Sequence, residues 1–210
     1  MLDITPELLN SLYWIGLVAV VVSSASGVLK AGFRQFDLFG VVIIAITTGL
    51  GGGSLRDMLL GQEVFWIKDQ IYFIASFASA LIIFVLARTI KVSDRLFLLP
   101  DAAGLAAFSI AGTLSSLMVG APWLLASFMG VVTGIMGGVF RDVLCNETPL
   151  VFKSPLYATA AWGGSLLFIA LLSFSIHPSV AAVASGLLIF IARLLALKYN
   201  LGLPKFRFKE

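Results

Sequence analysis

One ten-residue stretch occurs twice in the chain. The first copy, Thr48 to Asp57, reads Thr-Gly-Leu-Gly-Gly-Gly-Ser-Leu-Arg-Asp, and the second, Thr133 to Asp142, reads Thr-Gly-Ile-Met-Gly-Gly-Val-Phe-Arg-Asp. The copies are 85 residues apart, and six of their ten positions are identical. A duplication at a fixed offset constrains the fold strongly, because both halves must adopt the same local structure. We therefore predict a chain built from two related halves.

The composition places these halves in a bilayer. Hydrophobic residues make up 60% of the 210 residues and charged residues only 12%, whereas soluble domains are near half apolar and a quarter charged. The formal charge of +3 is too small, and its bases too scattered, for a nucleic-acid surface. Cys145 is the only cysteine, which excludes an intrachain disulfide. No nucleophile–base pair, phosphate loop or metal-ligand spacing stands out, so we expect neither an enzyme nor a bound cofactor.

Long uncharged windows mark the membrane-spanning helices, each of which needs about 20 apolar residues. Three windows have the length of one helix: Leu8–Leu29, Leu38–Leu55 and Gln70–Ala87. Two more, Ala102–Phe140 and Ser154–Ala192, hold 39 residues each. Each of these is interrupted near its middle by helix breakers, Gly120-Ala121-Pro122 in one and His177-Pro178 in the other. We predict an all-α integral membrane protein with seven transmembrane helices.

The offset of 85 residues covers three of these helices. Because three is odd, the second copy must face the opposite way, which gives an inverted-topology repeat of the kind common in transporters. The expected organisation is a single transmembrane domain over residues 1–210. It contains two three-helix repeats, at about 8–91 and about 99–174, and a seventh helix at about 179–199.

The basic residues indicate an orientation. With the N-terminus outside, twelve of them fall on the inner side, and only Arg56 and Lys68 fall outside. Cytoplasmic loops are enriched in Lys and Arg, so we predict an outside N-terminus and a cytoplasmic C-terminus. The basic tail from Lys198 to Lys209 is expected to lie against anionic lipid headgroups.

Glycines dominate the duplicated stretch. Each glycine costs an apolar helix about 1 kcal/mol of helix propensity, so we predict a kink or an unwound turn in both copies. Irregular backbone at membrane depth is tolerated where it lines a wet cavity, and freed carbonyls together with nearby hydroxyls favour a cation there. The candidate kink residues are Gly49, Gly51, Gly52, Gly53, Gly134, Gly137 and Gly138, and the candidate hydroxyls belong to Thr47, Thr48, Ser54 and Thr133.

An arginine and an aspartate follow each glycine cluster. Neighbours in a helix point about 100° apart, so we expect pairing between the copies, Arg56 with Asp142 and Arg141 with Asp57. Ionisable residues inside a membrane are functional candidates by default. The alternative is that all four are anchors at helix ends, with snorkelling arginines.

Four other residues have simpler interpretations. Asp37 and Asp101 are expected to be helix N-caps. Lys68 and its duplicate Lys153 are expected to be interfacial anchors. The duplication of these lysines leaves open a minor role in a conduction pathway.

The two motifs, Gly-Gly-Gly-x-x-Arg-Asp and Gly-Gly-x-x-Arg-Asp, together with Asp101-Ala102-Ala103-Gly104-Leu105, resemble the trimeric intracellular cation channel family in its prokaryotic branch. The resemblance extends to about Tyr199. It implies a homotrimer in a bacterial inner or plasma membrane, in contact with its lipids, with a separate pore in each protomer. It also implies passive conduction of monovalent cations, mainly potassium, along kinked second and fifth helices. One departure is Met136, which stands where the first copy has Gly51, so the fifth helix is expected to bend less.

Three functions are compatible with these features. A cation channel uses the glycine breaks, the hydroxyls and a charged constriction. A secondary carrier for a small zwitterion such as glycine would hold the carboxylate on an arginine and the ammonium group on an aspartate. The same domain has also been labelled a glycine transporter. A purely structural membrane scaffold leaves the duplicated charges without a role.

Overall fold

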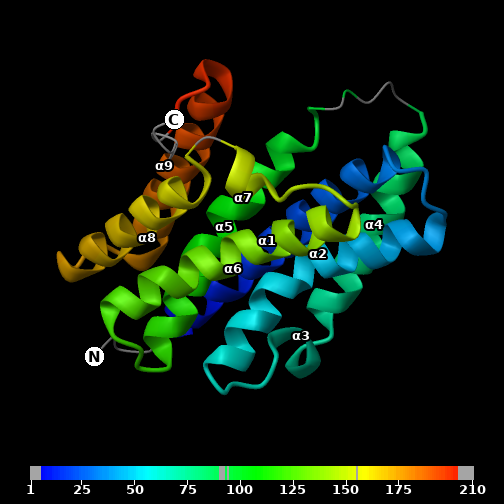
Figure 1. Cartoon of the computed structure of the whole chain (residues 1–210). Helices are drawn as coiled ribbons and strands as arrows, with labels where there is room; N and C mark the ends of the chain where they lie inside the picture. Colours follow the sequence, from blue (N-terminus) through cyan, green and yellow to red (C-terminus); the bar gives the residue numbers. More distant parts are fainter. Residues whose placement is uncertain (1–5, 90–92, 94, 155, 203–210) are drawn as a thin grey trace.

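The structure, a computed structural model, describes residues 6–89, 93, 95–154 and 156–202. Within these ranges every regular element is a helix (Figure 1). In chain order the helices are α1 (Pro6–Gly32), α2 (Leu38–Leu59), α3 (Phe65–Lys68), α4 (Ile71–Ala87), α5 (Leu98–Met118), α6 (Trp123–Leu144), α7 (Leu150–Lys153), α8 (Tyr157–Ser173) and α9 (Pro178–Tyr199). The prediction of an all-helical chain is confirmed for the described residues.

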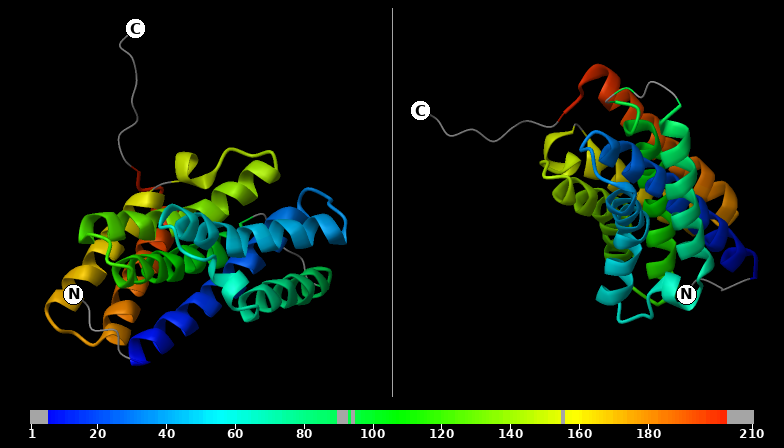
Figure 2. Two further views of the ribbon diagram at one scale, coloured as in Figure 1. Left: turned by 90° about the horizontal axis from the view of Figure 1, so that it is seen from below. Right: turned by 90° about the vertical axis from the view of Figure 1, so that its right-hand side faces the viewer.

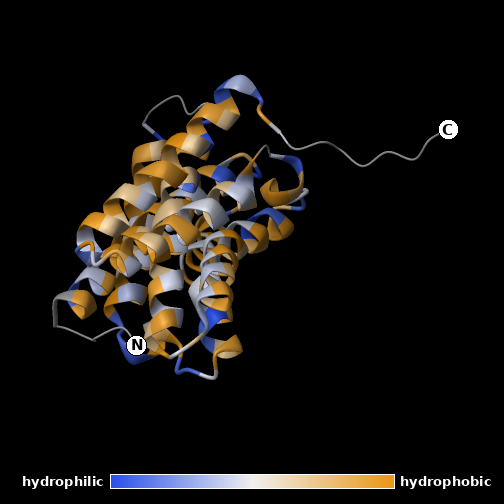
Figure 3. Cartoon of the chain, turned by 90° about the vertical axis from the view of Figure 1, so that its left-hand side faces the viewer, coloured by the Kyte–Doolittle hydropathy of each residue, from blue (hydrophilic) through white to orange (hydrophobic). Residues whose placement is uncertain are grey.

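Five helices are long and apolar enough to cross a membrane: α1, α2, α5, α6 and α9. The helices α4 and α8 are apolar but have only 17 residues each, about 26 Å of helix at 1.5 Å per residue. Both predicted breaks in the long windows are confirmed, since α5 ends at Met118 before α6 begins at Trp123, and α8 ends at Ser173 before α9 begins at Pro178. Hydrophobic residues cover the flanks of the long helices (Figure 3).

The helix lengths repeat along the chain. The helices α2, α3 and α4 have 22, 4 and 17 residues, and α6, α7 and α8 have the same lengths in the same order. At the centre, α1 packs on α2, α5 packs on α6, and these two pairs pack on each other through α1 with α5 and α2 with α6. The helix α4 covers one flank of this centre, and α8 and α9 cover the other (Figures 1 and 2).

The duplicated glycines lie where α2 crosses α6. A Cβ atom on Gly52 would overlap the carbonyl oxygen of Thr133, and a Cβ atom on Gly137 would overlap the carbonyl oxygen of Thr48. The contact is therefore reciprocal, backbone against backbone. Small residues allow such close approach in lipid, where packing rather than the hydrophobic effect holds helices together.

The predicted unwound turns are wrong. Both α2 and α6 continue as α-helix through their glycine clusters, from Leu38 to Leu59 and from Trp123 to Leu144. The propensity cost of the glycines is offset by the contacts that they permit, which a local propensity argument does not include. Two further glycines of the first copy pack against aromatic side chains, Gly51 against the ring of Phe140 and Gly53 against the ring of Phe65.

Each half repeats one further contact. Gly49 of α2 lies against Ser24 of α1, and at the same offset Gly134 of α6 lies against Ser109 of α5. The expected N-cap at Asp37 is confirmed, since the Gly40 amide donates to Asp37 Oδ1 over 2.8 Å. These contacts hold the start of α2 and the middle of α2 and α6, ahead of the last turns that carry the duplicated charges.

A single methyl group at the crossing tests the backbone contact. We expect Gly52→Ala and Gly137→Ala each to lower the free energy of unfolding by about 1–3 kcal/mol, because the new carbon must displace a carbonyl oxygen. Gly163→Ala is the matched control, since a Cβ atom there meets open space and gains helix propensity. Thermal unfolding in mild detergent measures the difference. Equal melting temperatures for the three variants would contradict the contact.

Candidate functional site

The duplicated charges lie one turn beyond the glycine crossing, in the last turns of α2 and α6. All four side chains are buried, with exposed fractions of 5% for Arg56, 4% for Asp57, 0% for Arg141 and 1% for Asp142. Buried charges are tolerated when they are paired and hydrogen-bonded. The interpretation of these arginines as surface anchors is therefore wrong in this structure.

The pairing is within each copy and not between them. Arg56 Nε donates to Asp57 Oδ1 over 2.7 Å, and Arg141 Nε donates to Asp142 Oδ1 over 2.9 Å. The predicted pairs Arg56–Asp142 and Arg141–Asp57 are wrong. The 100° separation of neighbouring Cβ atoms did not exclude the contact, because an arginine side chain is long enough to fold back onto the next residue.

Each aspartate also holds the short helix that follows. Asp57 Oδ2 accepts from the Phe65 amide, and Asp142 Oδ2 accepts from the Leu150 amide, both over 2.9 Å. These amides belong to the first residues of α3 and α7, so the carboxylates satisfy donors that a helix start leaves unpaired. In each copy, one aspartate thus connects the arginine at the end of the long helix with the first amide of the short helix.

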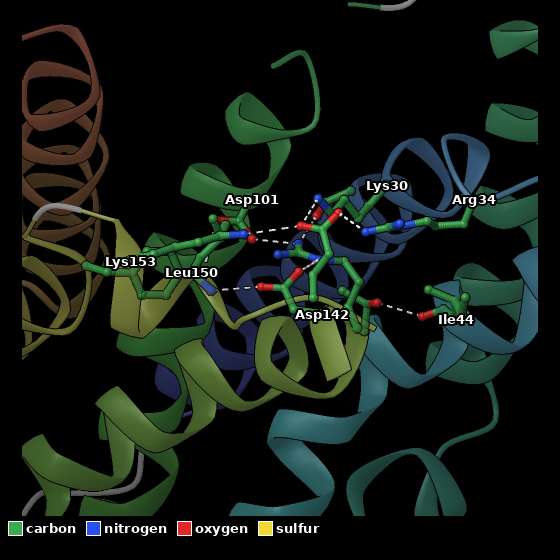
Figure 4. Close-up of polar contacts among 12 residues, drawn as sticks. Lys30, Arg34, Ile44, Asp101, Asp142, Leu150 and Lys153 are labelled. Carbon is green, nitrogen blue, oxygen red and sulfur yellow. Dashed lines mark hydrogen bonds and ion pairs between the residues drawn. The ribbon is translucent and has the colours of Figure 1, made fainter. Parts of the chain in front are cut away.

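The second copy has a carboxylate that the first copy lacks. Asp101 of α5 accepts from Arg141 Nη1 over 2.6 Å through Oδ1 and from the Tyr157 hydroxyl over 3.0 Å through Oδ2 (Figure 4). The expectation of a helix N-cap is wrong, because α5 begins at Leu98 and Asp101 lies inside its first turn. At the offset of 85 the first copy has Gly16, and there Tyr72 donates to the Tyr13 carbonyl oxygen over 3.3 Å.

A second buried arginine, Arg193 of α9, lies beside this carboxylate. Its exposed fraction is 0%, its guanidinium lies 4.4 Å from the centre of the Tyr157 ring, and Nη2 donates to Ser154 Oγ over 3.0 Å. Arg193 is one of the twelve bases assigned to the inner side and was not expected in the site. The sequence signal that could have identified it was a single arginine in the apolar last helix, because charged residues inside membrane helices are functional candidates.

The candidate hydroxyls are used within their own helices. Thr47, Thr48, Ser54 and Thr133 each donate to the carbonyl oxygen four residues earlier. Ser54 Oγ also accepts from Trp66 Nε1 over 2.8 Å. Such bonds use the donor and leave acceptor positions on the oxygen. Thr48 and Thr133 are buried, and their hydroxyls lie against Gly27 of α1 and Gly112 of α5. The oxygens that lie at the crossing of α2 and α6 are the backbone carbonyl oxygens of these two residues.

The loop after α6 is tied to α1 by a cluster that sequence analysis did not identify. Glu147 forms ion pairs with Lys30 and Arg34 of α1, both at 2.6 Å, and with Lys153 of α7 at 3.2 Å (Figure 4). Burial raises the pKa of Glu147, but the hydrogen bonds from Lys30, Lys153 and Arg34 outweigh it and lower the pKa to about 2. Lys153 and its duplicate Lys68 are both exposed, at the ends of α7 and α3, and Lys153 pairs with Glu147.

Two segments of the chain, residues 13–88 and 98–173, match one protein-family model, which is described as a glycine transporter. The two matched segments begin and end 85 residues apart, the same offset as the duplicated stretches. The duplication therefore covers almost the whole of each half.

Relatives of similar length exist in several bacteria. The UPF0126 inner membrane protein YadS of Escherichia coli K12 is 36% identical over 202 residues, which cover 94% of this chain and 97% of YadS. A UPF0126 membrane protein of Vibrio cholerae is 38% identical over 197 residues, which cover 93% of this chain and 82% of that protein. This chain is thus similar to bacterial inner membrane proteins.

Solved structures share the fold. The crystal structure of a TRIC trimeric intracellular cation channel orthologue from Rhodobacter sphaeroides has a TM-score of 0.86 and 32% identity, and the match covers 90% of this chain and 98% of that one. A second structure, which addresses conductance through TRIC cation channels, has a TM-score of 0.82 and 32% identity over 93% of this chain and 97% of that one.

Removing the extra carboxylate tests the charged centre of the second copy. We expect Asp101→Asn to lower the free energy of unfolding by about 3–5 kcal/mol, because it leaves a buried arginine undercompensated. Asp37→Asn makes the same change at an exposed N-cap, where asparagine caps as well as aspartate, and should have little effect. Denaturant unfolding in detergent compares the two. If Asp101→Asn were no more destabilising than Asp37→Asn, the centre would not depend on this carboxylate.

The Glu147 cluster predicts a dependence on pH. The pKa of Glu147 in the folded protein is about 2, below its ordinary value of 4.5. Its stabilising contribution is therefore complete above about pH 4.5 and is lost as the pH falls toward 2. We expect Glu147→Gln to melt at a lower temperature than the parent at pH 7, with a difference that narrows below pH 4.5. The exposed Glu63→Gln is the control, and a gap of constant size from pH 7 to pH 3 would contradict the assignment.

Proposed function

The chain belongs to the trimeric intracellular cation channel family, and from that membership we propose that it is a passive channel for monovalent cations with potassium as its main permeant ion. The observation that carries the proposal is the α2–α6 crossing. There a backbone contact lies one turn before two buried charged centres whose arginines are each compensated by aspartate. Compensation matters because an unpaired arginine would repel a cation.

We propose that the pathway follows the interface of α2 and α6 and that the structure has it closed. The backbones touch at Gly52 and Gly137, which leaves no room for an ion at that level. Separation of the two helices would expose the backbone carbonyl oxygens of Thr48 and Thr133 to the gap. Those oxygens keep acceptor positions after their bonds within the helix and can replace part of an ion's water shell.

The proposed architecture has seven membrane spans, in two inverted three-helix units and a final helix. Five helices meet the length criterion, and the 17-residue α4 and α8 complete the count if the bilayer thins locally around them. The equal helix lengths and the two matched family segments support the pair of units. An odd number of spans puts the termini on opposite sides.

We place the C-terminus in the cytoplasm. Arg141 and Arg193 are buried in this structure, so they no longer count as loop bases, and four others, Lys91, Lys205, Arg207 and Lys209, lie outside the described residues. On the outer side Arg56 is also buried, which leaves Lys68. The lysines and arginines at the ends of α1, α4 and α9 lie on the proposed inner side, so basic residues are still in excess there.

We propose that three copies assemble and that each protomer has its own pathway. The support is the relatives' description as trimeric channels. It agrees with the position of the α2–α6 crossing inside one chain, so that no second copy is needed to form it.

A second candidate is a carrier for a small zwitterion such as glycine. The description of the matching family model and the adjacent opposite charges favour it. In this structure, however, the carboxylates and the arginines are bonded to one another, so a zwitterion would have to displace those bonds. The solved relatives, which are described as channels, favour the first candidate.

Added methyl groups at the crossing test the pathway. We expect the double variant Gly52→Ala, Gly137→Ala to lower potassium flux into liposomes, because each methyl group would lie against a carbonyl oxygen that the open pathway exposes. Gly163→Ala is the matched control, since a Cβ atom there meets open space on α8. Native mass measurement checks that all variants remain trimers.

Two outcomes would overturn the proposal. Parental potassium flux in the double variant would place the pathway elsewhere in the molecule. Saturable exchange of labelled glycine by the parent protein, without potassium flux, would establish the carrier instead.

A further inference from the structure

A cavity of about 300 Å³ lies between the end of α1, the start of α2 and the end of α4. Three aromatic rings, those of Phe33, Phe36 and Phe84, line it together with aliphatic side chains. Gly32 leaves it open, since a Cβ atom there would meet nothing within 4 Å. The cavity is separate from the α2–α6 crossing and from the charged centres.

One positively charged side chain lies at this cavity. Arg88, the C-cap residue of α4, contributes to the lining and places its guanidinium 5.4 Å from the centre of the Phe84 ring. Among the described residues, no carboxylate lies within ion-pair distance of Arg88. By contrast, the nearby bases Lys30 and Arg34 are both ion-paired with Glu147.

The duplication shows that these features are not part of the shared scaffold. At the offset of 85, the second copy has Leu117 in place of Gly32 and Ser173 in place of Arg88. The opening and the cation are therefore both found in the first copy only. If they served the common packing of the two halves, the same residues would be expected in both.

We infer that this cavity binds an anionic phospholipid, with one acyl chain among the phenylalanine rings and the phosphate on Arg88. The apolar lining suits hydrocarbon, and the exposed guanidinium at the helix end suits a phosphate at headgroup depth. Basic pockets between membrane helices on the cytoplasmic side are sites for anionic headgroups. The site lies beside the ends of α1 and α4, where the bases of this chain gather.

The test replaces each feature with the residue of the other copy. Purified protein in nanodiscs of phosphatidylglycerol or of phosphatidylcholine is released into the mass spectrometer, and the retained lipid is counted. We expect the parent to retain phosphatidylglycerol about fivefold better than phosphatidylcholine, as one arginine at an anionic surface would give. Gly32→Leu and Arg88→Ser should each remove this preference.

Matched controls are available for both changes. Gly163→Leu adds the same side chain in open space on α8, and Arg95→Ser removes an exposed arginine outside the cavity. Both should retain phosphatidylglycerol like the parent. Equal retention of the two lipids by the parent, parental retention by either cavity variant, or equal losses in the controls would each overturn the inference. Because the readout is lipid retention and not ion flux, failure here leaves the proposed channel function untouched.

Discussion

The backbone contact between α2 and α6 is the constraint around which the molecule is arranged. Two helices can approach this closely only where both lack side chains, and Gly52 and Gly137 supply that at the same point of the crossing. The contact fixes the register of one half against the other. Arg56 and Arg141 then follow one turn later on their helices, so the crossing also sets where the buried charges lie.

In each copy, short-range hydrogen bonds hold the last turn of the long helix, which carries the buried charges. Each aspartate takes its neighbouring arginine with one oxygen and the amide of a short helix with the other. Breaking such a buried pair costs about 3–5 kcal/mol, because one charge remains uncompensated. Each aspartate therefore connects the end of its long helix to the short helix that follows.

Much of the fold could be predicted because it depends on local signals. Charge-free windows, Pro122, Pro178 and the Asp37 cap located the helix ends, and the offset of 85 revealed the duplication. The glycine clusters were misinterpreted because their cost is local whereas their benefit lies on another helix. The Arg-Asp pairing was misassigned because an arginine side chain can fold back onto the next residue. Tertiary contact decided the role of Asp101, whose partner is 40 residues away in the chain. No periodicity or spacing in the sequence carries that information.

Asp101 and Arg193 have no counterpart in the first copy, and their charges are opposite. In the second centre, the two negative charges of Asp101 and Asp142 exceed the single positive charge of Arg141. Arg193, whose guanidinium lies over the Tyr157 ring, adds a positive charge beside that centre, and it comes from α9, which lies outside the two matched segments. Among the described residues, the first centre thus has one arginine and one aspartate, and the second has two of each. An uncompensated charge inside a membrane protein is costly, so Arg193 of α9 allows the second copy to carry an additional carboxylate without that cost.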